Sequence, residues 1–561
     1  MKISYQFLIA FTWFINSNHL LTAQKQSQPN ILWITCEDIS PTLSFYGDST
    51  ASTPTLDKLA AESLIYTNAF ATVGVCAPSR SSIITGMYPI SIGTHNMRTA
   101  KDYNGWGLRK YNLPSNAKDI KGNKVPLYSV VTPPEIKCFT EYLREAGYYC
   151  TNNVKTDYQF AAPVSAWDAN NDKAHWKNRA EGQPFFAVFN LDITHESRIW
   201  LNKELPLTVD KETVPLPPYY PDNPVVRQDV ARNYSNIELL DKQVADLIKE
   251  IEDAGLLDNT IIFFYSDHGG PLPRGKREHY DSGLKVPFLV RFPHSKAAGR
   301  VDELISFVDL APTVLSLAGI QVPDYMQGRA FLGTHKKAGT ARNYVFGSGD
   351  RFDDYSDRIR TVRDKNYLYV KNYYPELPAY KDVTYRKNID MMNTLLSLRD
   401  KDSLKGPTAQ WFKPHKPAEE LYDVNADPYN MHNIINDSAY ANKVKEMRTA
   451  LEDWLATVGD KGAEVELDLL HKMWPGGVQP VTSSPILEYV NDKITASTGT
   501  EGASLVYIVS KKPLEPGLNA GWQLYQNPIK LLKGERAYFM AARIGFADSK
   551  VVEYIKGISI N

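Results

Sequence analysis

Cysteine is scarce in this chain. Only 4 of its 561 residues are cysteine, at positions 36, 76, 138 and 150. Small exported domains that depend on disulfides carry a much higher proportion of cysteine. The sequence therefore excludes a disulfide scaffold, and its length allows a large hydrophobic core spread over more than one domain. Cys36 lies in an apolar run and is expected in that core.

An excess of charge of one sign is also lacking. Lysine and arginine together number 63, against 64 acidic residues, and the formal net charge is -1. A balanced chain has no overall field that draws it to nucleic acid or to an acidic membrane. The sequence therefore predicts no nucleic-acid partner, and any anionic substrate must be bound by a local group of cations.

Long hydrophobic runs are absent beyond the N-terminus. Residues 1–23 carry a lysine at position 2, an apolar run from Phe7 and a polar stretch after Ala23. This pattern is typical of a secretory signal peptide with cleavage near Ala23, and a buried N-terminal helix is the alternative. The run is too short to span a bilayer, and no later segment qualifies as a transmembrane helix. We expect an exported protein, either periplasmic or secreted.

Short runs rich in isoleucine, valine and phenylalanine alternate with helical patterns along the chain. Such alternation is typical of parallel strands joined by crossover helices, so the predicted fold class is α/β. The expected strands are residues 30–36, 184–191, 260–266 and 286–293, and the expected helices are residues 55–64, 135–147, 227–254 and 309–319.

The most informative motif is Cys76-Ala77-Pro78-Ser79-Arg80, which follows a short loop and opens an expected helix. Proline near the start suits a helix N-terminus. Such a terminus offers unpaired N–H groups to an anion, and Arg80 adds a planar cationic donor suited to oxyanions. The alternative is a small buried cysteine beside a turn.

These five consecutive residues, with Thr85-Gly86 at the end of the expected helix, resemble the signature of type I sulfatases. The resemblance implies that a formylglycine-generating maturation enzyme oxidises Cys76 to formylglycine (3-oxoalanine). The hydrated aldehyde would be the nucleophile, and Arg80 would hold it in place. If Cys76 is modified, Cys138 and Cys150 are the only short-range pair left for a disulfide.

The resemblance also implies an alkaline phosphatase-like sandwich, with a large mixed, mostly parallel sheet between helices. We expect a catalytic domain at 28–405, a smaller C-terminal subdomain at 406–475 and a β-rich, sandwich-like accessory module at 481–561. The module is similar to extensions of exported bacterial carbohydrate enzymes, and either a spacer role or sugar binding would fit it.

Two acidic pairs follow expected strands, Glu37-Asp38 after the first and Asp267-His268 after the third. Open α/β sheets place their sites at such strand ends, and hard divalent cations prefer oxygen ligands. A solvated turn or a helix cap is the alternative for either pair alone. The resemblance implies one calcium ion held by Glu37, Asp38, Asp267, His268 and residue 76, although sulfatases typically carry aspartate at the position of Glu37.

The remaining catalytic residues are implied by their positions relative to the sulfatase pattern. Lys155 and Lys276 match two lysines that contact sulfate, and His195 resembles the histidine that protonates the leaving oxygen. The family commonly has a histidine two residues after the first lysine, whereas this chain has Asp157. A carboxylate can also act as a base, so Asp157 is a further catalytic candidate.

The block from Gly349 to Tyr374 resembles exported bacterial sulfatases that act on polysaccharides, so a sulfated carbohydrate of the ulvan or glycosaminoglycan type is the expected substrate. Arginine recognises sulfate and carboxylate groups through paired hydrogen bonds. Ordinary ion pairs are the alternative role for these side chains. The candidate substrate contacts are His95, Arg98, Arg351 and Arg358.

Two other functions stay open at this point. A formylglycine-dependent phosphonate or phosphate ester hydrolase would share the motif and the metal ligands, and parallel assays on aryl sulfate and aryl phosphonate would separate it. A catalytically silent glycan-binding protein would leave Cys76 unmodified and would bind polysaccharide without releasing sulfate.

Overall fold

The computed structural model describes residues 28–99, 102–107, 111, 113, 115–294, 298–339 and 341–556. The predicted signal peptide at 1–23 lies outside these residues. Within the described part of the chain, no helix combines the length and the apolar character that crossing a membrane requires.

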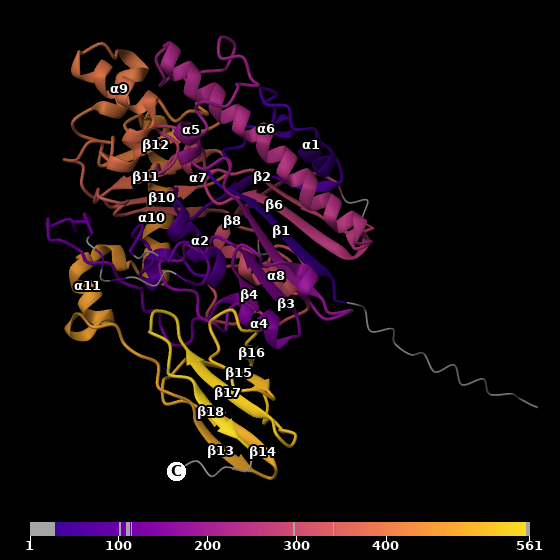
Figure 1. The fold of residues 1–561 in the computed structure, drawn as a ribbon. Coiled ribbons are helices and arrows are strands. Elements are labelled where there is room, and N and C mark those ends of the chain that lie inside the picture. Colours follow the sequence, from indigo (N-terminus) through magenta and orange to yellow (C-terminus); the bar gives the residue numbers. More distant parts are fainter. Residues whose placement is uncertain are drawn as a thin grey trace, which may run out of the picture.

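A mixed sheet of eight strands lies at the centre of the larger part of the molecule (Figure 1). In chain order the strands are β1 Asn30–Cys36, β2 Ser63–Phe70, β3 Tyr149–Asn153, β4 Ala169–Asn170, β5 Phe185–Leu191, β6 Thr260–Ser266, β7 Phe288–Arg291 and β8 Gly299–Ser306. Their order across the sheet is β4-β3-β5-β1-β6-β7-β2-β8. Only β7 runs antiparallel to its neighbours β6 and β2, so the mixed, mostly parallel sheet is confirmed.

Strand β1 is buried along its whole length and pairs in parallel with both β5 and β6. Alternate residues of a strand point to opposite faces of the sheet. Leu32 and Ile34 accordingly belong to one core, whereas Ile31 and Trp33 belong to another. A strand covered on both faces needs an unbroken apolar run, which explains why β1 and β6 coincide with the predicted ranges.

Helices cover both faces of this sheet. On the first face lie α1 Pro54–Ala61, α5 Ser197–Leu201, α6 Pro224–Asp253 and α9 Asp390–Asp400; on the second lie α2 Cys76–Thr85, α4 Phe139–Glu145 and α8 Leu310–Leu317. Figure 1 shows the long helix α6 beside α1 and across the sheet from α8. The predicted helix at 55–64 extends too far, because β2 begins at Ser63.

A second, antiparallel sheet follows the first. It consists of β9 Val345–Gly349, β10 Ile359–Arg363, β11 Tyr367–Asn372 and β12 Glu419–Asp423, and it packs against α10 Ala441–Val458. The short helices α3 Pro89–Ile92, α7 Asp281–Leu284 and α11 Glu466–Met473 complete this part of the molecule.

The C-terminal region forms two small antiparallel sheets. One is the hairpin of β13 Ile486–Val490 and β14 Lys493–Ser497; the other contains β15 Ser504–Ser510, β16 Gln523–Leu524, β17 Arg536–Ala542 and β18 Val552–Ile555. One face of the four-stranded sheet shares a hydrophobic cluster with Val164 from the larger part of the chain. Arg144 on α4 also donates to the Trp522 carbonyl at 2.6 Å. The four-stranded sheet and the loop at Trp522 are therefore packed against α4 and the residues that follow it, and the boundary of the module at 481–561 stays a prediction.

The expected disulfide between Cys138 and Cys150 is wrong, because both side chains are free thiols. Cys138 caps α4 and Cys150 lies in β3, and both are buried in the same hydrophobic core. The Cys150 thiol donates to the Thr140 carbonyl at 3.8 Å. Both thiols are therefore packed side chains of this core, and no covalent bond joins them.

We expect Trp522→Ala to lower the midpoint of thermal unfolding of the whole chain. Trp522 is buried in one cluster with Val164 and with residues of β15 and β17. Truncating a buried tryptophan to alanine costs about 3–5 kcal/mol. Leu532→Ala is the matched control, since Leu532 lies in the same module and is exposed. Equal midpoints for the two variants, measured by circular dichroism, would show that the module does not support the larger part.

Candidate active site

Cys76 is the first residue of α2 and is fully buried. The loop before it passes so close to the segment around Glu278 that a Cβ on Gly74 would lie 2.2 Å from the Glu278 carbonyl oxygen. Glycine at position 74 therefore permits this close approach. The Cys76 Sγ lies 3.3 Å from Nε2 of His268, so the motif faces the end of β6.

The predicted acidic pairs meet because β1 and β6 are adjacent and in register. Cys36 pairs with Ser266, so the residues that follow each strand leave the sheet at the same level. Nε2 of His268 lies 3.1 Å from Asp38 Oδ1 and 3.6 Å from Asp267 Oδ1. The Asp38 amide donates to Asp267 at 3.3 Å.

The ligand atoms have a spacing suited to a divalent cation. One atom each from Glu37, Asp38, Cys76 and His195 lie within 4.8 Å of one another, and so do one atom each from Cys76, Asp267 and His268. Ligands on opposite sides of an ion with bonds of ~2.4 Å are separated by a similar distance. His268 donates its Nδ1 proton to the Gly269 carbonyl at 2.9 Å, which leaves Nε2 facing this space. The residues present therefore fit such an ion.

Three cationic side chains neutralise the carboxylates. Lys155 Nζ lies 2.7 Å from Glu37 Oε2. Lys276 Nζ lies 2.8 and 3.0 Å from the two carboxylate oxygens of Asp38. Arg80 donates through Nε to Asp267 at 3.0 Å, and one of its terminal nitrogens, Nη2, has no hydrogen-bond partner among the described residues. The cations thus surround Cys76 and keep donor capacity for an anion.

The electrostatics of the cluster favour positive charge beside the acids. Burial disfavours the charged form of His268, but the carboxylates of Asp267 and Asp38 outweigh it and raise its pKa to about 10. A metal ion that binds Nε2 would displace the proton from this atom. Burial also opposes the ionisation of Asp267, yet the charges of His268 and Arg80 hold its pKa below the usual range. Asp267 therefore remains ionised although it is removed from water. Burial likewise opposes the ionisation of Asp38, but Lys276 and His268 outweigh it and lower its pKa, whereas burial raises the pKa of Glu37.

His195 lies on the other side of the cluster, after β5. Its Nδ1 accepts from the Ser197 amide at 3.2 Å, so Nε2 carries the proton of the neutral ring and lies 3.8 Å from Glu37 Oε2. Burial, followed by the charges of Lys276 and Lys155, lowers the pKa of His195 well below its usual value. The neutral ring therefore presents an N–H donor to the site.

Asp157 lies 3.8 Å from Lys155 Nζ, and its buried Oδ2 has no hydrogen-bond partner in the described part of the chain. Asp157 adopts φ +53°, and Asp38 and Arg98 also have positive φ angles, of +54° and +58°. Non-glycine residues in this conformation cost energy and concentrate at functional sites. Contacts with the surrounding structure must therefore offset the cost of the positive φ angles of these three residues.

The four expected substrate contacts separate into two groups. Arg351 is buried and forms a two-point ion pair with Glu466, at 2.6 and 2.7 Å, and Arg358 donates to Asp460 at 2.8 Å. These ion pairs engage Arg351 and Arg358 with acids of the protein, although the buried Nε of Arg358 has no hydrogen-bond partner among the described residues. Their contact with substrate stays a prediction.

His95 and Arg98 have fewer partners than the other two. His95 is buried, and its Nδ1 lacks a hydrogen-bond partner in the described chain. The Nε atom of Arg98 is likewise buried and unpartnered, and its guanidinium carbon lies 5.6 Å from the centre of the Tyr103 ring. Arg98 therefore keeps a charge that no ion pair with a described residue neutralises.

Sequence reasoning missed three residues that organise the site. Glu196 forms a two-point ion pair with Arg277 at 2.8 Å and also lies 3.3 Å from Lys276. Asn190 accepts from Arg80 at 2.6 Å. The only available signal was position, because Glu196 and Arg277 directly follow His195 and Lys276 in the chain.

Comparisons with known proteins agree with this geometry. Residues 29–320 match the family model named Sulfatase, and residues 274–404 match that of the N-sulphoglucosamine sulphohydrolase C-terminal region. An ulvan-active sulfatase of Formosa agariphila is 43% identical over 94% of this chain and 91% of its own. N-sulphoglucosamine sulphohydrolase of Homo sapiens is 27% identical over 76% and 89% of the two chains.

A solved phosphonate monoester hydrolase of Agrobacterium radiobacter shares the architecture. Its TM-score is 0.53 at 15% identity, and the match covers 77% of this chain and 97% of that protein. A likeness at this level of identity shows the fold alone, because one fold supports many activities.

We expect calcium to raise the midpoint of thermal unfolding of metal-free protein, because an ion that binds only the folded state stabilises it, by about 2.7 kcal/mol at 100-fold excess over Kd. Asp267→Asn should remove most of this shift. Asp253→Asn, which changes an exposed acid at the end of α6, should retain it. The metal assignment fails if both variants respond to calcium as the parent protein does.

Proposed function

The chain belongs to the sulfatase family and hydrolyses sulfate esters, and from that premise we propose that Cys76, oxidised to formylglycine, supplies its nucleophile. The observation that carries the proposal is the convergence on one buried side chain. Cys76 Sγ shares a space of 4.8 Å with both acidic pairs, and those acids are paired with Arg80, Lys155 and Lys276. Such a setting suits a nucleophile that must attack an anion.

In the first step a hydroxyl oxygen of the hydrated aldehyde at position 76 attacks the sulfur and gives its proton to a carboxylate of the cluster, whose acids have oxygen atoms within 4.8 Å of Cys76 Sγ. The bond between sulfur and the ester oxygen breaks. The departing alkoxide takes a proton from Nε2 of His195 in its imidazolium form, which the negative charge of the bound sulfate favours over the neutral ring. In that form Nδ1 donates to the Ser197 hydroxyl at 2.8 Å. His195 therefore acts as the general acid. The product of this step is a sulfated hemiacetal on residue 76.

In the second step the hemiacetal expels sulfate and the aldehyde forms again. We assign Asp157 as the base that accepts the proton of the remaining hydroxyl, since its Oδ2 is buried and unpartnered 3.8 Å from Lys155 Nζ. Water then adds to the aldehyde and restores the hydrate. Asp157 thus takes the place of the histidine that the family commonly carries.

The cations of the site stabilise negative charge on the sulfate oxygens through both steps. Arg80, Lys155 and Lys276 are fixed by their carboxylate partners, so little reorganisation is needed when the charge develops. A calcium ion held by Glu37, Asp38, Asp267 and His268 would act as a Lewis acid toward the sulfate. The acids and the cations therefore have complementary roles.

The substrate we propose is a sulfated polysaccharide or its oligosaccharides, of the ulvan or glycosaminoglycan type. The relative from Formosa agariphila is named an ulvan-active sulfatase and aligns over 94% of this chain, which supports the first type. Arg98 is the contact we favour for a neighbouring carboxylate or sulfate, since its charge has no ion-pair partner among the described residues. We further propose that the protein is exported and is matured by a formylglycine-generating enzyme.

Cys76→Ala should abolish sulfate release, because no other group at that position can attack sulfur. Cys150→Ala, at a buried cysteine outside the site, should stay active and is the matched control. Mass spectrometry of the peptide that contains residue 76 should show an aldehyde in the active protein. Sulfate release by Cys76→Ala, or an unmodified thiol in fully active protein, would refute the nucleophile assignment.

Arg98→Ala should reduce kcat/KM on a sulfated oligosaccharide by about 10- to 100-fold, the usual effect of losing a charge-assisted hydrogen bond. The loss should be smaller on an aryl sulfate, which carries no second anionic group. Arg358→Ala serves as the control, because its partner is Asp460 of the protein. Equal losses on both substrates would contradict a contact with a neighbouring sugar.

A further inference from the structure

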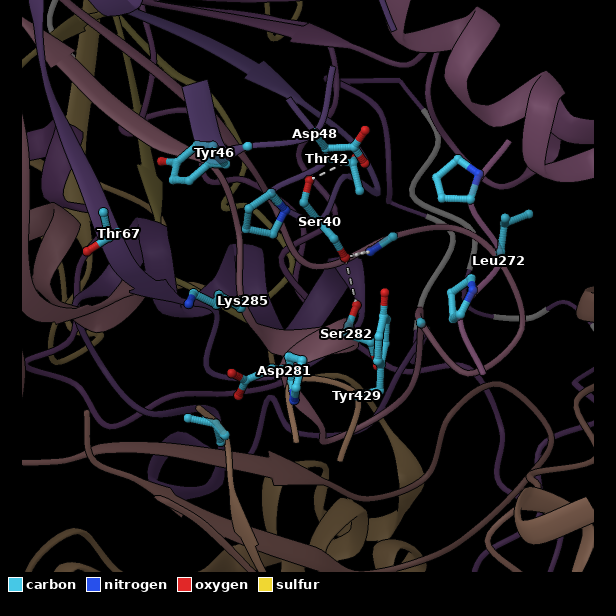
Figure 2. A pocket seen from close by; sticks show the side chains of 18 of the residues that line it. Ser40, Thr42, Tyr46, Asp48, Thr67, Leu272, Asp281, Ser282, Lys285 and Tyr429 are labelled. Atoms are coloured by element: carbon cyan, nitrogen blue, oxygen red, sulfur yellow. Dashed lines mark hydrogen bonds between the residues drawn. The ribbon is translucent and has the colours of Figure 1, made fainter. Parts of the chain in front are cut away.

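A cavity of about 670 Å³ lies apart from Cys76 and contains none of the candidate catalytic residues in its lining. Its walls come from the residues after β1, the segment at 215–220, helix α6, the residues after β6 and the loops of the second sheet. Figure 2 shows Tyr46 and Asp48 on one side of it and Asp281 and Tyr429 on the other. Its volume suits a ligand of one or two sugar rings.

Tyrosine is the prominent side chain in the lining. The residues concerned are Tyr46, Tyr219, Tyr220, Tyr234 and Tyr429. Tyrosine offers a flat apolar face together with a hydroxyl group, a combination that suits the mixed apolar and polar surfaces of a sugar ring. The Tyr46 hydroxyl is fixed by bonds to the carbonyls of Tyr66 and Phe288 at 2.9 and 3.1 Å, so its ring is held rigidly.

The charges in the lining favour an anion. Four cations (Lys285, Arg300, Arg363 and Lys365) face two acids (Asp48 and Asp281), an excess of two positive charges. The acids are already bound, because Asp281 pairs with Arg363 and Asp48 accepts from the Tyr234 hydroxyl at 2.6 Å. Arg363 is thereby neutralised, and Lys365 is paired with Asp302, which lies outside the lining, at 2.6 Å. Lys285 and Arg300 therefore carry the positive charge that remains for a ligand.

Lys285 is the cation most available to a ligand. It is partly buried, and no described carboxylate lies within ion-pair distance of its Nζ. The Phe70 ring lies 6.0 Å from Nζ. Burial lowers the pKa of the Lys285 ammonium group, and the charge of Asp281, which lies beyond ion-pair distance, offsets this shift only in part. Bringing a cation out of water without a partner is costly, and an anionic ligand would supply that partner.

Asn233 gives a second and independent sign of a ligand. It lies on α6 in the cavity lining, its exposed fraction is 9%, and its Oδ1 has no hydrogen-bond partner in the described chain. A buried acceptor without a partner costs free energy. A sugar hydroxyl, which donates a hydrogen bond, would satisfy it.

We propose that this cavity is a second carbohydrate site, which binds one or two sugar rings that carry a carboxylate or a sulfate. Lys285 binds the acidic group, Asn233 accepts from a hydroxyl, and the tyrosines contact the ring faces. The segment that follows β6 separates the two sites, since Gly270 and Gly275 line the cavity while Lys276 bonds Asp38. The choice of an acidic or sulfated sugar as the ligand rests on the proposed function. The existence of the cavity and the properties of its lining do not depend on it.

The test is calorimetric titration of Cys76→Ala protein with a chondroitin disaccharide that carries a uronate and a sulfate. Two molecules should bind per chain, one at each site. Adding Lys285→Ala should weaken one of the two binding events by about tenfold or more, the usual effect of losing a charge-assisted hydrogen bond. Asn233→Asp, which keeps the side-chain shape and adds a negative charge, should weaken the same event.

Lys249→Ala is the matched control, because Lys249 is an exposed lysine at the far end of α6. It should leave both binding events unchanged, and the neutral disaccharide cellobiose should not bind at the cavity. A single binding event that Lys285→Ala and Asn233→Asp leave intact, or no binding, overturns the proposal. If the only binding event observed is one that Lys285→Ala weakens, the cavity proposal stands. The substrate proposed for the Cys76 site is then contradicted.

Discussion

The site depends on charge compensation in a space removed from water. Glu37, Asp38 and Asp267 are all buried, and isolated carboxylates in such a setting would lose their charge or destabilise the fold. Each is paired with a lysine or an arginine. These ion pairs keep the acids in position to bind a divalent metal ion. The same contacts fix the lysine and arginine side chains that would bind sulfate. Removing one partner leaves an unpaired buried charge, so the residues act as a unit.

The sheet brings this unit together, and the sequence predicted its central strands well. Strands β1 and β6 are covered on both faces, so their unbroken apolar runs identify them. Strands β2 and β8 were not foreseen, because Ser63–Phe70 and Gly299–Ser306 include polar and partly exposed residues and lack such a run. The same limit explains the overlong helix at 55–64, whose last apolar residue, Leu64, belongs to β2.

The sequence predicted those site residues that lie next to one another in the chain and act together in the site. The motif at Cys76 and the acidic pairs after two aligned strands are of this kind. Long-range partners could not be predicted, because no local pattern connects them. Arg351 pairs with Glu466 and Arg358 with Asp460, more than a hundred residues further along the chain. The pairing of Glu196 with Arg277 was missed for the same reason.

The most direct test of the account is a crystal structure of Cys76→Ala protein with calcium and a sulfated oligosaccharide. The account predicts a sulfate group whose sulfur faces the Cβ of residue 76, with its oxygens on Lys155, Lys276 and His195 and the ion between Asp38 and Asp267. A sulfate group bound away from residue 76, with no ion between the two acidic pairs, would contradict it.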